Sequence, residues 1–280
     1  MMLSGRAELA GVMGWPVAHS RSPRLHGYWL EQYGIDGAYV PLAVAPADLG
    51  AALAALPKLG FQGCNLTIPH KEAALPHMAR LEESARLVGA VNTVVVEAGA
   101  LVGSNTDISG FAENLKSGGG PGDVTRPALV LGAGGAARAV LAALKALGFS
   151  SVFLVNRTPE RAAALARDLH ALGLTLMPRP WSERDALVRE AALIVNTTSL
   201  GMSGEPPLDL SLDGARDDAV VTDIVYTPLE TSLLKSARTR GLRAIDGLGM
   251  LLHQARPGFH AWFGIDPQVT DELRAHMLGA

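Results

Sequence analysis

The sequence predicts an α/β protein of two domains, and three observations carry that prediction. Short apolar runs of strand length alternate with helical stretches along most of the chain. At 280 residues, with 48% hydrophobic and 18% charged residues, the chain is globular and long enough for two cores. A glycine-rich turn, GAGGAA at residues 132–137, joins a strand pattern to a helix pattern in the second half.

The first domain is expected to span residues 1–106 and to be resumed at about 249–280. Strands are predicted at 8–14, 38–44 and 63–68, with a hairpin formed by 91–97 and 101–104. Helices are predicted at 23–33, 46–56 and 69–80. Ser22 is expected to cap the first helix, with Pro23 as its first residue, and Pro76 should kink or end the third.

The second domain is expected over residues 107–248. After a connecting helix at 109–116, the glycine-rich stretch 117–122 is predicted to be flexible. Strands at 127–131, 151–155, 174–177, 192–196, 220–224 and 242–245 alternate with helices at 136–147, 159–172, 182–190 and 230–240. This alternation predicts right-handed crossovers and a parallel sheet. The helix at 248–263 and the tail behind it should return to the first domain.

The turn at 132–137 indicates a dinucleotide site. Gly132 permits the tight turn, Gly134 lets a pyrophosphate approach the backbone, and Ala137 lets helix and strand pack closely. The N-terminus of the helix offers N–H groups and a partial positive charge to phosphates. We therefore predict that residues 107–248 form a nucleotide-binding domain of the Rossmann type.

The end of the next strand favours NADP over NAD. An NAD site usually places an acidic residue there to bind the ribose 2′-hydroxyl, and none occurs between Ser150 and Thr158. Arg157 stands there instead, and Arg161 follows within one helical turn of Pro159. Two guanidinium groups match a 2′-phosphate, which a carboxylate would repel.

Composition argues against several classes of function. The net charge of −3 and the lack of a dense basic stretch argue against nucleic-acid binding. The eight histidines and the single cysteine, Cys64, show no metal-ligand spacing, so we expect no metal. One cysteine fits a reducing compartment, and we expect a cytoplasmic protein. No stretch has the length and composition of a membrane span or of a signal peptide.

Polar residues gather at predicted strand ends in the first domain. Ser20 and Ser22 precede a helix and suit a carboxylate, although Ser22 serves equally well as a helix cap. Lys71 lies in the first turn of a helix, where the helix dipole disfavours a cation. An acidic partner is therefore expected, and Asp107 is a candidate. On local grounds a catalytic pair and a structural ion pair both remain open.

Nine segments resemble, in order, the motifs of shikimate dehydrogenases. They are GWPVAHSRSP (14–23), NLTIPHK (65–71), GAVNT (89–93), SNTD (104–107), GAGGAA (132–137), NRT (156–158), NTTSLGM (196–202), DIVYTPLET (223–231) and DGLGMLLHQA (246–255). Three residues depart from the usual pattern of that family, because Gly27, Ile108 and Thr197 stand where it commonly has Asn, Gly and Ala.

This resemblance implies the reversible, NADPH-dependent reduction of 3-dehydroshikimate to shikimate, a step of chorismate and aromatic amino acid biosynthesis. Lys71 would be the general acid/base, paired with Asp107. The implied substrate-binding residues are Ser20, Ser22, Thr67, Lys71, Asn92, Asp107, Tyr226 and Gln254. The implied NADP(H)-binding residues are Gly132, Ala133, Gly134, Gly135, Ala136, Asn156, Arg157, Thr158, Arg161, Ile224, Gly247 and Met250.

Two other functions remain open. A quinate/shikimate dehydrogenase of the same superfamily would accept quinate as well, although relatives that prefer NAD tend to carry an acid near the position of Arg157. A non-catalytic NADP sensor would be favoured by the loss of Lys71 or Asp107, and both are present. We expect a small-molecule substrate, neither nucleic acid nor membrane as a partner, and a monomer or homodimer.

Overall fold

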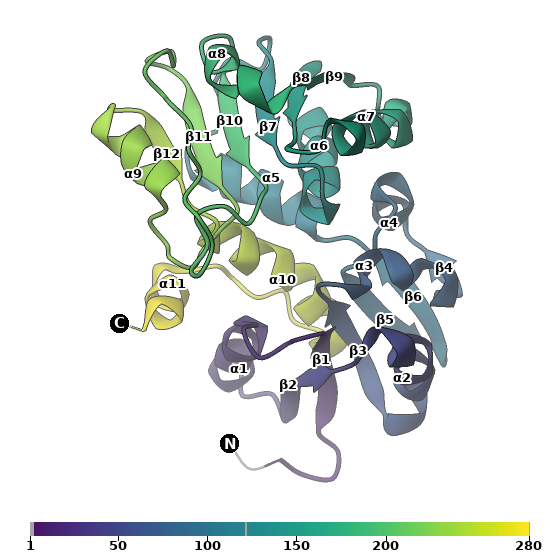
Figure 1. Cartoon of the computed structure of the whole chain (residues 1–280). Helices are drawn as coiled ribbons and strands as arrows, with labels where there is room; N and C mark the ends of the chain where they lie inside the picture. Colours follow the sequence, from purple (N-terminus) through teal and green to yellow (C-terminus); the bar gives the residue numbers. More distant parts are fainter. Residues whose placement is uncertain (1–2, 121, 280) are drawn as a thin grey trace. The chain divides into compact units, whose positions relative to one another are not determined.

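The computed structural model of the chain describes residues 3–120 and 122–279, and Figure 1 shows its elements. The chain divides into two compact units. The first unit extends to Asp107 and resumes at Leu251, and the second is Ile108–Met250. Each unit is built on its own sheet, as an α/β protein of two domains requires.

The first unit contains a mixed sheet with the strand order β2-β1-β3-β5-β6-β4. Its strands are β1 (Glu8–Gly14), β2 (Gly37–Ala43), β3 (Phe61–Leu66), β4 (Arg80–Leu81), β5 (Thr93–Glu97) and β6 (Ala100–Ser104). Strands β1, β2 and β3 are parallel, whereas β5 is antiparallel to both β3 and β6. Two antiparallel steps make β3 and β6 run in the same direction, so their carboxyl ends meet at one edge of the sheet.

Helices of the first unit cover this sheet. They are α1 (Ser22–Gln32), α2 (Leu49–Ala55), α3 (His70–Ala73), α4 (Glu83–Val88), α11 (Asp271–Leu278) and α10 (Leu248–Phe263) from Leu251 onward. Aromatic side chains hold the C-terminal segment against the rest of this unit. Trp262 donates a hydrogen bond to the Val94 carbonyl at 3.0 Å, and Phe259 packs on Trp29.

The start of α1 differs from the prediction. The helix begins at Ser22 itself, and Arg21 occupies the cap position without a side-chain hydrogen bond. The expectation that Ser22 caps the helix is therefore wrong. The Ser20 hydroxyl accepts from the backbone N–H of Ser22 at 3.3 Å and satisfies one N–H of the first turn instead.

The predicted helix 69–80 is also wrong in extent. It is replaced by the short α3, a 3₁₀ turn η3 (Leu75–His77) and the strand β4. Pro76 lies inside η3, where a residue without an N–H cannot continue an α-helix. The same happens in the preceding predicted helix, which starts as a 3₁₀ turn η1 (Pro46–Asp48) and becomes α2 only at Leu49.

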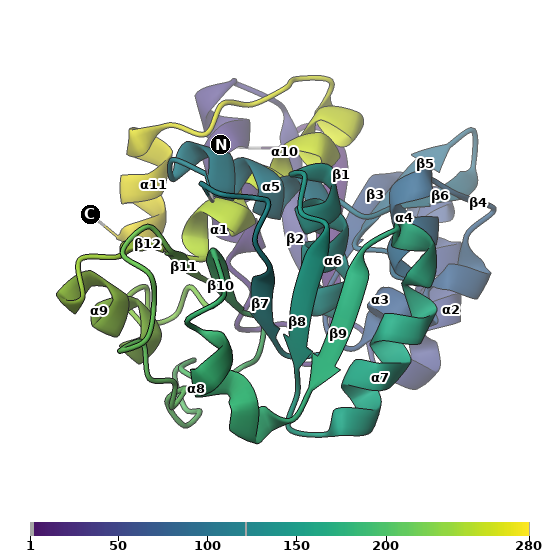
Figure 2. The ribbon, with the colours of Figure 1, turned by 90° about the horizontal axis from the view of Figure 1, so that it is seen from above.

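The second unit contains a sheet with the order β12-β11-β10-β7-β8-β9, in which every neighbouring pair is parallel. Its strands are β7 (Ala128–Leu131), β8 (Ser151–Val155), β9 (Thr175–Arg179), β10 (Leu193–Asn196), β11 (Val220–Asp223) and β12 (Arg243–Ile245). The predicted parallel sheet is confirmed. Figure 2 shows β7, β8 and β9 in succession, with α7 along β9.

Both faces of the second sheet are covered by helices. Its helices are α5 (Asp107–Ser117, from Ile108), α6 (Gly135–Ala146), α7 (Pro159–Asp168), α8 (Arg184–Leu187), α9 (Ser232–Thr239) and the first residues of α10. Residues of α8 and α9 pack on the face that carries Leu129, Phe153 and Val221. Right-handed crossovers place α6 and α7 on the opposite face. None of the helices in the described ranges has the length and apolar character to cross a membrane.

The glycine-rich stretch 117–122 lies inside the second unit. Pro121 falls outside the described residues, and the part before it is held in place. The Arg243 guanidinium donates to the carbonyls of Gly119 and Gly120, each at 2.7 Å, and the Gly120 N–H bonds the Leu115 carbonyl at 2.7 Å. These contacts bind the backbone of Gly119 and Gly120 to the rest of the unit, and the flexibility of the stretch stays a prediction.

Candidate active site

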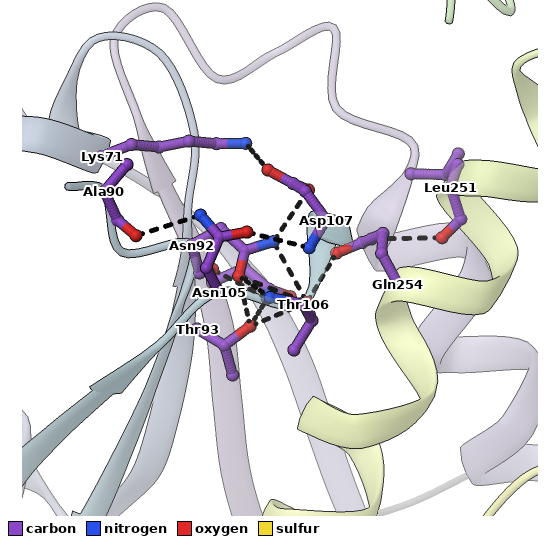
Figure 3. Close-up of polar contacts among 10 residues, drawn as sticks. Lys71, Ala90, Asn92, Thr93, Asn105, Thr106, Asp107, Leu251 and Gln254 are labelled. Atoms are coloured by element: carbon purple, nitrogen blue, oxygen red, sulfur yellow. Dashed lines mark hydrogen bonds and ion pairs between the residues drawn. The ribbon is translucent and has the colours of Figure 1, made fainter. Parts of the chain in front are cut away.

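Lys71 and Asp107 meet at the edge where β3 and β6 end. Lys71 is the second residue of α3, which follows β3, and Asp107 is the first residue of α5, which follows β6. The Lys71 Nζ atom lies 2.6 Å from Asp107 Oδ2, and the side chains are 25% and 10% exposed (Figure 3). The expected acidic partner of Lys71 is therefore present in the fold.

The backbone around Lys71 is held firmly. Its carbonyl accepts from the Val91 N–H at 2.8 Å, in the segment that leads to Asn92. The neighbouring His70 ring lies with Nε2 2.8 Å from the Val44 carbonyl, and a carbonyl can only accept, so the ring donates there. Both contacts fix the short helix α3 and thereby the base of the lysine side chain.

Asp107 is anchored at three points. Its Oδ2 atom accepts from Lys71, and its Oδ1 atom accepts from Asn92 Nδ2 at 2.8 Å. Its backbone N–H donates to Asn105 Oδ1 at 3.1 Å, while Asn105 Nδ2 bonds the Ala90 carbonyl. Figure 3 shows Lys71 and Asn92 at the two carboxylate oxygens and Asn105 at the backbone N–H. Donors on both oxygens hold the carboxylate in one orientation, with Oδ2 toward the lysine.

The other predicted substrate-binding residues lie at several places in the fold. Gln254 joins the cluster, since its Oε1 accepts from Thr106 Oγ1 at 3.4 Å and Thr106 lies beside Asp107 in the chain. Thr67 directly follows β3 and is half-buried. Ser20 and Ser22 lie at the start of α1, and in the described residues no hydrogen bond links Ser20 to Lys71 or Asp107. Tyr226 is half-buried in the second unit.

This cluster can exchange a proton. A lysine side chain that is one-quarter exposed can still reach a bound molecule, and the adjacent carboxylate holds its amino group in place. The same ammonium can stabilise negative charge that develops on an oxygen. Among the described residues no group of three or more His, Cys, Asp and Glu side chains could hold a metal ion.

The glycine turn of the second unit leaves its sheet at the point where strand order reverses. Strand β7 has β8 on one side and β10 on the other, and such a switch point is where open α/β sheets bind ligands. Gly132 has a φ of +112°, and a Cβ there would lie 2.5 Å from Thr197 Oγ1. The fold itself therefore requires glycine at this position.

Gly134 has a different reason to be glycine. Its φ of −99° suits any residue, and a Cβ there would meet nothing within 4 Å. It is the cap residue of α6, and no side-chain hydrogen bond caps this helix start. The open space at Gly134, at the start of this helix, suits the pyrophosphate of a dinucleotide.

The end of β8 carries two exposed guanidinium groups. Among the described residues neither the Arg157 nor the Arg161 side chain makes a hydrogen bond or ion pair, whereas Arg138 is paired with Asp168 at 2.6 Å. The Asn156 amide donates to the Thr158 carbonyl at 2.9 Å and shapes this turn. Two available cations at this position fit a 2′-phosphate.

Two of the residues expected near the nicotinamide are in contact. A Cβ at Gly247 would lie 2.3 Å from the Ile224 carbonyl, so glycine lets these two segments touch. The Ile224 segment is held by Asp223, whose buried carboxylate accepts from Asn196, from the Val225 N–H and from Thr231. Burial raises the pKa of Asp223 above its ordinary value. Met250, on α10, is also buried.

Several buried polar residues of the first unit are missing from the predicted site. Asn65, Thr93, Asn105 and Thr106 all hydrogen-bond within the network that holds Asp107. A signal for them exists in the sequence, because polar pairs such as Asn92-Thr93 interrupt otherwise apolar strand patterns.

A nucleotide-binding sheet and a lysine able to exchange a proton are together the parts of a nucleotide-dependent oxidoreductase. Comparison with known proteins narrows that class. Residues 12–94 match the family model described as shikimate dehydrogenase substrate binding domain, and residues 122–201 match the model described as shikimate / quinate 5-dehydrogenase. The chain belongs to the shikimate dehydrogenase family.

Individual relatives match over nearly the whole chain. Shikimate dehydrogenase (NADP(+)) of Rhodospirillum rubrum is 58% identical, with 99% of each chain covered. The structure of shikimate 5-dehydrogenase from Thermus thermophilus, in complex with NADP(H) and shikimate, is similar at a TM-score of 0.86 and 39% identity, covering 98% of this chain and 100% of the other. The quinate dehydrogenase of Corynebacterium glutamicum, in complex with NAD, is similar at a TM-score of 0.91 and 33% identity, covering 98% and 99%.

Proposed function

We propose that the protein is an NADP-dependent shikimate dehydrogenase that reversibly reduces 3-dehydroshikimate to shikimate, in the biosynthesis of chorismate and aromatic amino acids. The observation that carries this proposal is the Lys71–Asp107 pair, 2.6 Å apart, in a chain whose other unit has a dinucleotide-type glycine turn. The relatives named above support the substrate and the cofactor.

Lys71 is the general acid/base of this proposal. NADPH, when bound, supplies the hydride. Reduction of the ketone leaves negative charge on its oxygen, which the Lys71 ammonium stabilises and then protonates. In the oxidation of shikimate the neutral amine of Lys71 takes the proton back. Asp107 holds the ammonium in place.

The remaining substrate contacts follow the resemblance. Ser20 and Ser22, with Tyr226, bind the carboxylate of the substrate, and Thr67, Asn92 and Gln254 position its ring together with Lys71 and Asp107. The burial of Asn92 and Gln254, which are 2% and 8% exposed, keeps this set in fixed orientations.

The cofactor contacts lie in the second unit. The N–H groups from Gly132 to Ala136 bind the pyrophosphate, and Ile224, Gly247 and Met250 lie at the nicotinamide. The adenosine 2′-phosphate is bound by the turn after β8. Its binding residues are Asn156, Arg157, Thr158 and Arg161.

The direct test is turnover. The purified protein is mixed with NADPH and 3-dehydroshikimate, and loss of NADPH absorbance is followed together with the formation of shikimate. We expect stoichiometric conversion. NADPH binding without turnover would instead make the protein a sensor of the nucleotide.

A second candidate is a quinate dehydrogenase, favoured by the similarity to the Corynebacterium glutamicum enzyme bound to NAD. The exposed Arg157 and Arg161, with no acidic residue at the end of β8, favour NADP and the first candidate.

We further propose that the protein works in the cytoplasm, because its one cysteine, Cys64, is buried and free. We also propose that it is a monomer or a homodimer. Light scattering in solution, which measures the molar mass, distinguishes the two.

A further inference from the structure

The orientation of the Asn92 amide can be deduced from its partners. One of its side-chain atoms lies 2.8 Å from the backbone N–H of Thr106, which can only donate, so that atom is the oxygen. The amide nitrogen therefore faces Asp107 Oδ1 at 2.8 Å (Figure 3). Asn92 donates to the carboxylate, and this donor cannot be exchanged for an acceptor without breaking the bond to Thr106.

The same logic orients Asn65. Its side-chain nitrogen faces the Asn92 carbonyl at 3.0 Å, which can only accept. Its oxygen then faces the Tyr39 hydroxyl at 2.6 Å, so Tyr39 must donate. Burial raises the pKa of Tyr39 well above its ordinary value, which keeps the phenol protonated as this contact requires.

Thr93 links the two amides. Its hydroxyl oxygen accepts from Asn65 Nδ2 at 3.1 Å and donates to Asn92 Oδ1 at 3.0 Å, and the residue is 2% exposed. A second contact, to Thr106 Oγ1, is longer at 3.2 Å. The donors therefore follow one direction, from Tyr39 through Asn65, Thr93 and Asn92 to Asp107. Hydrogen bonds in such a chain polarise one another and strengthen the last bond.

We propose that Thr93 is a positioning residue for the Lys71–Asp107 pair, acting through the buried donor chain Tyr39–Asn65–Thr93–Asn92. This inference rests on the proposed function and deepens it. Thr93 touches neither Lys71 nor Asp107; its hydroxyl orients the Asn92 amide, whose N–H holds Asp107 Oδ1 so that Oδ2 faces the lysine.

The test compares two substitutions at position 93. Thr93→Val keeps the branched shape and removes the hydroxyl, whereas Thr93→Ser keeps the hydroxyl and removes a methyl group. We expect Thr93→Val to lower kcat for shikimate oxidation by about 10- to 100-fold through misplacement of the pair, with the KM for NADP unchanged. Thr93→Ser should restore turnover close to that of the unsubstituted protein.

Ser104→Ala is the matched control. Ser104 lies opposite Thr93 on β6, and within the described residues its hydroxyl bonds only the Thr93 carbonyl, at 3.5 Å, outside the donor chain. Its removal should leave kcat unchanged. Tyr39→Phe tests the chain itself, because it should lower kcat in the native background and have little further effect when added to Thr93→Val.

The outcomes separate this inference from the proposed function. If the unsubstituted protein does not turn over shikimate, the proposed function fails. If it does, and Thr93→Val keeps normal kcat while only its melting temperature falls, Thr93 is merely structural. Equal losses of kcat in Thr93→Val and Thr93→Ser, or additive effects of Thr93→Val and Tyr39→Phe, would also overturn the inference.

Discussion

At the scale of single residues, the site depends on one lysine and the carboxylate that holds it. Lys71→Ala removes the ammonium but leaves Asp107 with the donor from Asn92 and with its own backbone N–H bonded to Asn105 Oδ1. We expect kcat to fall by about 10²- to 10⁴-fold, the usual contribution of a general acid/base, with shikimate binding largely kept. Steady-state kinetics measures this, and Lys58→Ala, at an exposed lysine in the same unit, is the control. Near-normal turnover in Lys71→Ala would remove it from the mechanism.

A second residue-scale prediction concerns the choice of cofactor. Arg157→Ala removes an exposed guanidinium that is assigned to the 2′-phosphate. NADPH binding should weaken by about tenfold or more, while NADH, which lacks that phosphate, is little affected. Arg167→Ala on α7, also exposed, is the matched control and should change neither affinity. Equal losses for both nucleotides would contradict the assignment.

His26 gives a prediction for pH. It is fully buried and stacked on Tyr39 at 3.9 Å, and burial lowers its pKa from 6.5 to about 3. Between these values the unfolded chain binds a proton at His26 and the folded chain does not. The free energy of unfolding therefore falls as pH drops below 6.5, by about 1.4 kcal/mol per pH unit from this group.

Urea unfolding from pH 7.5 to 5 measures that slope. His26→Leu, of similar volume, removes the titrating ring and should make stability less dependent on pH over this range, whatever its effect at pH 7.5. An unchanged slope in His26→Leu would show that other groups carry the acid sensitivity.

At the scale of elements, two glycines of one turn should behave differently. Gly132→Ala places a Cβ 2.5 Å from Thr197 Oγ1 at a φ of +112° and should lower the free energy of unfolding by about 1–3 kcal/mol. Gly134→Ala meets open space and should cost no more than about 1 kcal/mol as a helix cap.

For nucleotide binding, in contrast to stability, Gly134→Ala should be the more damaging of the two substitutions. A methyl group at Gly134 occupies the space assigned to the pyrophosphate, so a folded Gly134→Ala protein should lose most of its NADPH affinity. Urea unfolding and NADPH titration by fluorescence, performed on the same samples, separate the two effects. Full NADPH affinity in Gly134→Ala would contradict a pyrophosphate at this turn.

Some helices and strands could be predicted from the sequence, and others could not. Strand β1 matches its prediction at both ends, and the turn before α6 is recognisable because apolar runs flank its glycines. Short helices were harder, because 3₁₀ turns at Pro46 and Pro76 and the four-residue α3 leave no helical period to detect. Helices α4 and α11 lie where the pattern predicts none.

The candidate site, too, could be predicted from the sequence only in part. Lys71 and Asp107 could be suspected from an unfavourable helix position and from motifs, but their contact depends on β5 placing β3 and β6 in the same direction. The chain of hydrogen-bond donors that ends at Asn92 could not be predicted from the sequence, because Tyr39, Asn65 and Thr93 come from three separate strands. Only the sheet register, with Asn65 opposite Thr93, brings them together.

At the scale of the whole molecule, the two units carry separate tasks in one chain. The first unit holds the Lys71–Asp107 pair, to which proton transfer is assigned in the proposed function, and the second holds the glycine turn and the exposed arginines. We therefore expect substitutions at Lys71 to change turnover and leave NADPH affinity intact, whereas those at Arg157 should act through NADPH affinity.

Oxidation of shikimate and of quinate, each measured with NADP and with NAD, tests both the substrate and the cofactor. We expect turnover of shikimate with NADP far above the other three combinations. Comparable turnover of quinate, or a preference for NAD, would contradict it and place the protein among broader dehydrogenases. No turnover in any combination, with NADPH still bound, would contradict catalysis itself.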